Sequence, residues 1–136
     1  MDIVTHGVVG AAAGSMYGHP IVGAVAGVMP DLVLGVRRRQ RPNPAYRYTH
    51  SLLVCVVFSG FAIMLNFDIG LAIFMGWLLH IVVDIPTHGN EWAPRPLYPF
   101  NTELMFNFPH HEWEFFNESW CWGLILSIGI CIICVL

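Results

Sequence analysis

The stretch VVGAAAGSMYGHPIVGAVAGVM, residues 8–29, decides how this chain folds. If it formed one straight apolar helix, His6 and Asp31 at its two ends would lie roughly 35 Å apart, at about 1.5 Å per residue. Its centre, from Gly18 to Pro20, argues against that helix, because an internal proline removes a backbone hydrogen bond. We therefore predict a re-entrant helical hairpin that brings both ends of the stretch back to one membrane face.

Three further apolar segments follow, at residues 51–67, 69–85 and 119–136. The first two are joined by a minimal turn, which predicts an antiparallel helical pair. The last is long enough to cross a hydrocarbon core of roughly 30 Å at about 1.5 Å per residue. The sequence thus predicts a single-domain, all-α integral membrane protein over residues 1–136, a small bundle with the re-entrant hairpin and three further membrane helices.

The composition favours a bilayer over water. Hydrophobic residues make up 56% of the chain, charged residues 11%, and the mean hydropathy is +0.61, whereas soluble domains are about 25% charged. The net charge of −3 is too small to suggest a nucleic-acid partner. Five of the six arginines fall between residues 37 and 47, and the positive-inside rule then predicts that this loop lies in the cytoplasm.

The strongest chemical signal lies in FMGWLLHIVVDIP, residues 74–86. His80 and Asp84 stand at i and i+4, so their side chains share one helical face. An Asp within such a segment costs about 2.5 to 3.5 kcal/mol on insertion scales unless a partner compensates it. Taken alone, the pair fits a structural ion pair as well as a metal site.

Other candidate ligands fall near the same predicted face, and these favour a divalent metal. They are His6, Asp31, His50 and His88. His88 could instead cap the helix or face water, because Pro86 interrupts the chain before it. A Ser51–His50 nucleophilic dyad is geometrically poor, since adjacent residues on a helix do not face one another; Thr49 or Ser51 as a helix N-cap, or as support for the imidazole, is the better interpretation.

A second i, i+4 pair, His110 and Glu114, occurs in PHHEWEFF at residues 109–116. It could supply a further metal ligand set. It could equally be a solvated turn at the membrane interface, where aromatic side chains such as its neighbours are enriched.

Four short motifs resemble those of a known family. They are Thr5-His6-Gly7, Met29-Pro30-Asp31, Arg47-Tyr48-Thr49-His50-Ser51 and His80-x-x-x-Asp84-x-Pro86-Thr87-His88-Gly89. In this order and over about the first hundred residues, the chain resembles the YdjM-like inner-membrane, metal-dependent hydrolases, which are similar to zinc-dependent phospholipase C.

The resemblance implies roles for these residues. Asp31, His50, His80 and Asp84 would bind one zinc, and His6 a neighbouring metal that Asp84 bridges. His88, His110 and Glu114 resemble the third-metal set of the phospholipase, so one to three ions are expected. The phospholipase also uses its mature N-terminal residue as a ligand, and this part of the pattern is absent here, because Met1 precedes Asp2.

Two functions follow as expectations. The first is zinc-assisted hydrolysis of a phosphoester at the cytoplasmic membrane face, with Asp31 and Asp84 as catalytic residues and membrane lipids nearby, a location that favours a lipid-linked substrate. The nitrogen and oxygen ligands favour zinc. The alternative is a non-enzymatic membrane protein that binds a metal or forms an ion or proton pathway. Such a pathway needs polar residues that reach the other membrane face, and the sequence offers only Asp68 and His19 there.

Overall fold

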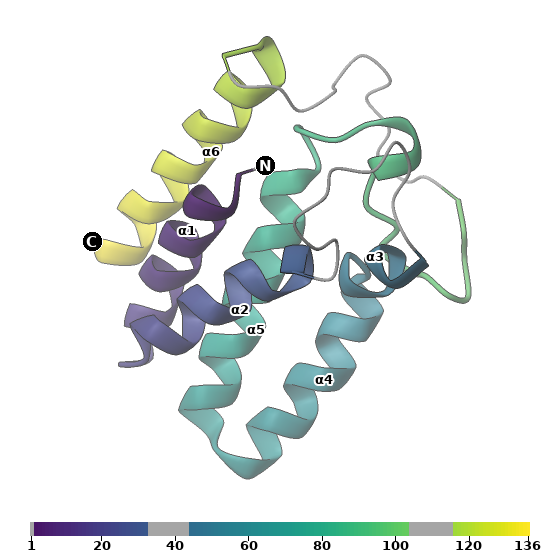
Figure 1. The fold of residues 1–136 in the computed structure, drawn as a ribbon. Coiled ribbons are helices and arrows are strands. Elements are labelled where there is room, and N and C mark those ends of the chain that lie inside the picture. Colours follow the sequence, from purple (N-terminus) through teal and green to yellow (C-terminus); the bar gives the residue numbers. More distant parts are fainter. Residues whose placement is uncertain (1, 33–43, 104–115) are drawn as a thin grey trace.

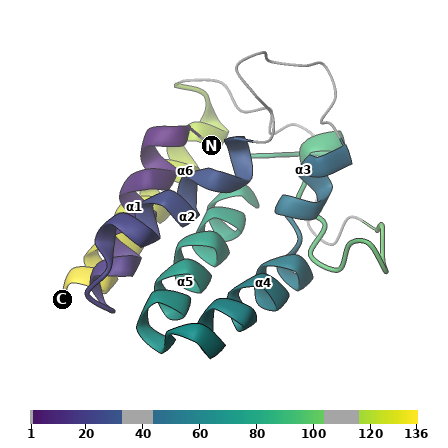
Figure 2. The same ribbon diagram turned by 60° about the horizontal axis from the view of Figure 1, so that its bottom comes forward.

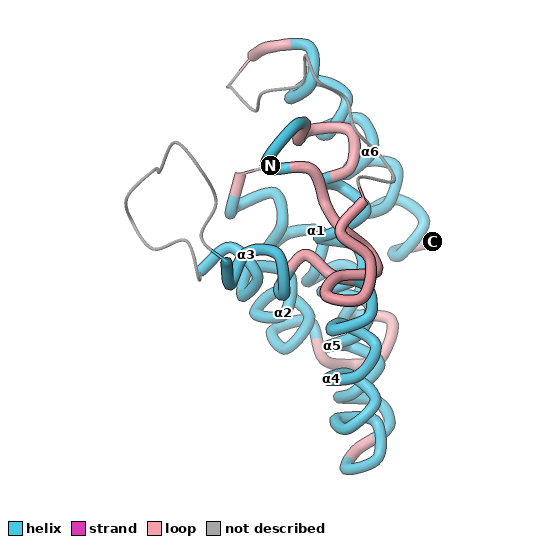
Figure 3. Tube along the Cα trace, turned by 90° about the vertical axis from the view of Figure 1, so that its right-hand side faces the viewer, coloured by secondary structure: helices cyan, strands magenta, loops and turns pink. Residues whose placement is uncertain are grey.

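The computed structural model describes residues 2–32, 44–103 and 116–136, and this part of the chain is helical with no strand (Figure 3). The elements are α1 (Ile3–Ser15), α2 (Pro20–Leu32), α3 (Pro44–Thr49), α4 (Leu52–Leu65), α5 (Phe67–Asp84), the short 3-10 helix η1 (Asn90–Trp92) and α6 (Glu118–Val135). The prediction of an all-α chain is confirmed for these residues.

The predicted break in the first apolar stretch is present. Helix α1 ends at Ser15, and α2 begins at Pro20, where the missing proline N–H costs no helical hydrogen bond. Between them, Gly18 takes a φ of +74°, a left-handed conformation that glycine adopts without steric cost. The chain therefore reverses here, as the sequence predicts.

Glycines let α1 and α2 pack at very short range. A Cβ on Gly23 of α2 would overlap the carbonyl oxygen of Gly10 in α1, so neither position has room for a side chain. This contact sets the start of α1 beside the end of α2. His6 and Asp31 consequently lie at the same end of the hairpin, with 3.8 Å between Nε2 and Oδ2.

Helix α5 is the centre of the molecule, between α2 and α4 in Figures 1 and 2, and it contacts α1, α2, α4 and α6. It begins at Phe67 and is capped by Asn66, whose side chain accepts a hydrogen bond from the backbone N–H of Ile69 at 3.0 Å. It ends at Asp84, near Asp31 at the end of α2. Helix α6 packs along α1 (Figure 1).

Two of the described helices, α5 and α6, are long and apolar enough to cross a membrane. Their 18 residues each span about 27 Å. Helix α4 is shorter than the sequence suggests, with 14 residues or about 21 Å. Among the described residues, two helices of membrane-spanning length are fewer than the sequence predicts, because Ser51 and Asn66 cap α4 at its two ends and limit it to 14 residues.

Many large apolar side chains lie on the outer surfaces of the helices and not in the core. In α4 the exposed ones are Val56, Val57, Phe58, Phe61, Met64 and Leu65, and in α6 they are Trp122, Ile125, Ile128, Ile132, Ile133 and Val135. Soluble monomers seldom expose apolar surface on this scale. These surfaces are suited to contact with lipid.

Candidate metal centre

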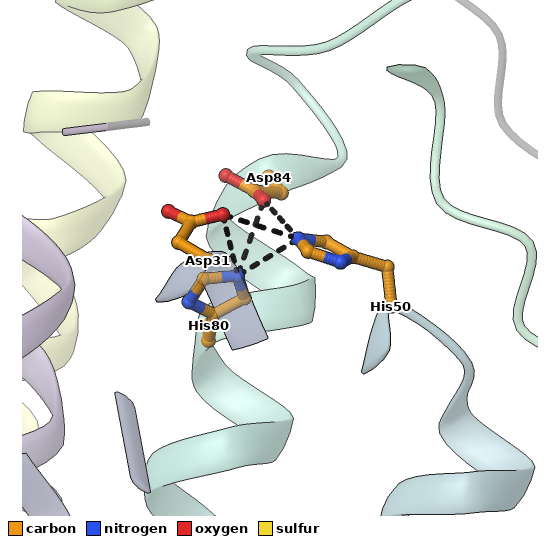
Figure 4. Close-up of side chains that lie close together, drawn as sticks. All are labelled: Asp31, His50, His80 and Asp84. Carbon is orange, nitrogen blue, oxygen red and sulfur yellow. Dashed lines mark hydrogen bonds and ion pairs between the residues drawn. The ribbon is translucent and has the colours of Figure 1, made fainter. Parts of the chain in front are cut away.

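Four acid and imidazole side chains from separate segments meet at one end of α5. Asp31 comes from the last turn of α2, His50 from the junction between α3 and α4, and His80 and Asp84 from the last turns of α5. Figure 4 shows the four side chains directed toward one another. One ligand atom from each residue lies within 4.8 Å of the others, which is the compactness a single cation requires.

The two imidazoles face each other across this cluster. Nε2 of His50 lies 3.0 Å from Nε2 of His80. His50 Nε2 is 3.2 Å from Asp84 Oδ2 and 3.5 Å from Asp31 Oδ1. His80 Nε2 is 3.4 Å from Asp84 and 3.8 Å from Asp31. The predicted shared face of His80 and Asp84 is therefore confirmed, and it points at the cluster.

Backbone carbonyls fix which nitrogen of each ring carries the hydrogen. Nδ1 of His80 lies 2.6 Å from the Gly27 carbonyl oxygen, and Nδ1 of His50 lies 3.0 Å from that of Tyr46. A carbonyl only accepts, so each Nδ1 donates, and in the neutral rings both Nε2 lone pairs are directed into the cluster. Lone pairs at this distance repel one another unless a proton or a cation lies between them.

This arrangement fits a zinc ion. In tetrahedral coordination with Zn–N bonds of about 2.0 to 2.1 Å, two ligand nitrogens stand about 3.3 Å apart, close to the 3.0 Å between the two Nε2 atoms. The carbonyl partners of His50 and His80 are also the kind of outer contact that orients imidazole ligands of metals. The four residues therefore fit a divalent metal ion.

Asp84 belongs to this cluster and also contacts two further imidazoles, those of His6 and His88. Its Oδ1 is 3.1 Å from His6 Nε2 and 3.3 Å from His88 Nδ1, while Oδ2 faces His50 and His80. The His6 ring stacks on the His80 ring with 3.8 Å between centroids. Its Nδ1 is buried with no hydrogen-bond partner among the described residues. A second cation beside Oδ1 is chemically compatible with this pair of imidazoles.

Burying these charged and polar side chains costs free energy unless a counter-charge lies nearby. His6, His50, His80 and Asp84 are all buried, and a buried carboxylate needs close positive or hydrogen-bonding partners. Asp31 differs, because its side chain remains 14% exposed, so solvent reaches the centre at this residue.

The pKa of His50 reflects the same environment. Burial alone lowers this pKa, but hydrogen bonds to the carboxylates of Asp31 and Asp84 outweigh it and raise the pKa above the ordinary histidine value. His50 therefore holds a proton more tightly than an exposed histidine, and a metal must displace that proton to bind.

The remaining predicted residues have mixed outcomes. Ser51 caps α4 by accepting a hydrogen bond from Val54, and the Thr49 hydroxyl donates to the Pro30 carbonyl at 3.0 Å, so both have the supporting roles expected of them. His88 extends the Asp84 face instead of turning away. His110 and Glu114 lie outside the described residues.

Sequence reasoning missed Tyr46, which is buried against His50. The signal for it is weak, because Tyr46 lies in the arginine-rich stretch that the sequence predicts to be a loop. A six-residue helix forms there instead, and Tyr46 lies one turn before His50.

No curated protein and no solved structure matches this chain. A family model does: the one described as YdjM inner membrane protein matches residues 1–136. Together with the two apolar helices of membrane-spanning length, this match identifies a membrane protein. The chain belongs to the YdjM inner membrane protein family.

Proposed function

We propose that this protein is a membrane-bound, metal-dependent hydrolase that cleaves a phosphoester at the cytoplasmic membrane face. The observation that carries the proposal is the pair of Nε2 atoms of His50 and His80, 3.0 Å apart, beside two carboxylates. Carbonyl partners direct both lone pairs inward, so the donors are arranged for a cation before one binds.

The ligand sets follow from the distances. Asp31, His50, His80 and Asp84 would hold the first ion, and His6 a second ion next to it, with Asp84 shared between the two. His88 is near enough to Asp84 to take part. The resemblance to phospholipase C, and no distance, would add His110 and Glu114 as a third set with His88. The nitrogen and oxygen donors favour zinc.

Asp31, Asp84 and Ser51 would have different roles in the hydrolysis. A divalent ion in such a site lowers the pKa of water and polarises a phosphoryl oxygen. Asp31, the one partly exposed side chain among the four ligands of the first ion, is suited to accept a proton from the attacking water. Asp84 is buried among four imidazoles and keeps the donors in place. The Ser51 hydroxyl donates to the Tyr98 carbonyl at 2.7 Å, which favours water as the nucleophile.

The surroundings of the site support a lipid-linked substrate. The centre lies at one end of α5, and the helices beside it expose apolar side chains suited to lipid. A phosphoester carried on a lipid would therefore be concentrated at the mouth of the site. The arginine-rich stretch at residues 37–47 supports a cytoplasmic position for this end under the positive-inside rule.

Metal content and hydrolysis, measured together, test the proposal. In detergent-purified protein, Asp84→Ala and His80→Ala should each lose bound zinc and phosphoester hydrolysis. The control is His19→Ala, since His19 lies at the hairpin turn away from the cluster. Unchanged metal and activity in either site variant would overturn the assignment. Zinc binding by the wild type without hydrolysis of any phosphoester offered would favour the non-enzymatic alternative.

A further inference from the structure

Tyr46 touches the candidate centre without being one of its ligands. It is 2% exposed and is among the largest fully buried side chains. Its ring stacks on the His50 imidazole, with 3.7 Å between centroids and 23° between planes. The carbonyl of the same residue accepts from His50 Nδ1 at 3.0 Å. One residue therefore contacts both the face of this imidazole and the nitrogen that sets its tautomer.

The other end of the Tyr46 side chain reaches the segment after α5. Its hydroxyl donates to the Trp92 carbonyl at 2.9 Å, and its ring meets the Trp92 ring edge-on at 5.2 Å. Trp92 is the last residue of η1 and comes four residues after His88. Tyr46 thus connects the part of the chain that carries His50 to the part that carries Asp84 and His88.

His50 needs such support more than His80 does. His80 lies within α5, and its neighbours in that helix hold its backbone. His50 lies in the junction between α3 and α4, so the direction of its ring depends on what packs against it. We infer that Tyr46 is the positioning residue that holds His50 in metal-binding orientation; this rests on the metal centre of the proposed function.

Cobalt titration of metal-free protein in detergent tests the inference, because visible Co²⁺ bands report both affinity and coordination geometry. Tyr46→Leu removes the flat ring and should weaken Co²⁺ binding by about 10- to 100-fold and change the visible spectrum. Tyr46→Met has a longer, unbranched side chain that adapts to the space of the ring; it should behave in the same way and serves if the leucine variant does not fold. Tyr46→Phe keeps the stacked ring and should restore the wild-type spectrum and most of the affinity.

Tyr48→Leu is the matched control. Tyr48 is two residues further on, is 45% exposed and packs against Tyr98, away from the four ligands. This variant should bind Co²⁺ as the wild type does.

The outcomes separate this inference from the proposed function. Wild-type affinity and spectrum in the Tyr46→Leu and Tyr46→Met proteins would overturn the inference, even if their melting temperatures fell, because a purely structural role predicts that result. Wild-type protein that binds Co²⁺ but hydrolyses no phosphoester would overturn the hydrolase and leave the positioning role supported. A wild type that binds no metal would overturn both.

Discussion

The carboxylate of Asp84 contacts four imidazoles. Its Oδ2 faces His50 and His80, and its Oδ1 faces His6 and His88. The sequence indicated the contact with His80, because i, i+4 residues share a helical face. The hydrogen bonds from His80 Nδ1 to the Gly27 carbonyl and from His50 Nδ1 to the Tyr46 carbonyl could not be predicted. They depend on the position of backbone carbonyls in the folded chain.

The raised pKa of His50 predicts a pH-dependent contribution to stability in metal-free protein. A group whose folded-state pKa is raised stabilises the fold fully below its unfolded value, here about 6.5, and loses this contribution as pH rises through the folded value. The stability difference between the wild type and His50→Gln should therefore be largest at low pH and shrink as pH rises.

Thermal denaturation of chelator-treated protein between about pH 5.5 and 8.5 measures this difference. Both proteins are compared in the same detergent, so that effects common to both cancel. A difference that grows with pH would mean that His50 is not held by the two carboxylates in the metal-free state.

At the level of elements, the α1–α2 hairpin decides whether a centre can form. Its break was predictable, because Gly18 and Pro20 have backbone preferences that act locally. Helix α3 was not, since its six residues are too few to show a helical period and its Tyr and Thr are weak helix formers. The burial of Tyr46 and its bond to Trp92 accompany that helix, and neither is visible from local sequence.

The glycine contact inside the hairpin gives a second prediction. Gly23→Ala places a Cβ against the Gly10 carbonyl oxygen and 2.7 Å from Gly14 Cα, so α1 and α2 must separate. We expect a loss of about 1 to 3 kcal/mol in the free energy of unfolding, together with weaker metal binding because His6 moves away from Asp84.

Gly60→Ala in α4 is the control for this variant, because a Cβ at Gly60 meets nothing within 4 Å. It should be neutral or stabilising by up to about 1 kcal/mol, as alanine is the better helix former. Equal unfolding free energies for Gly23→Ala and the wild type would show that the hairpin is packed less closely than described.

For the whole molecule, the centre lies at one end of α5, and the turn at Asn66 lies at the other, about 27 Å away along the helix. The apolar composition predicted a membrane protein, and the family match and two long helices agree. The bounds of α4 were close to the predicted apolar segment, because its capping residues Ser51 and Asn66 lie where polar residues interrupt the apolar pattern.

The proposed orientation can be tested with single cysteines in a background in which the four native cysteines are alanine. Asp68→Cys, at the start of α5, should react with a membrane-impermeant maleimide added to the outer side of the intact inner membrane. Glu91→Cys, near the metal centre, should react only after permeabilisation, because the arginine-rich stretch keeps that end inside. The opposite pattern of labelling would place the centre outside.

The central claim is that Asp31, His50, His80 and Asp84 bind one divalent ion. X-ray absorption at the zinc edge, on protein loaded with a single equivalent of zinc, tests it most directly. We predict a first shell of only nitrogen and oxygen at about 2.0 to 2.2 Å, with the outer-shell scattering of two imidazoles. A sulfur shell at about 2.3 Å would assign the metal to cysteines and contradict the account, as would the absence of bound zinc.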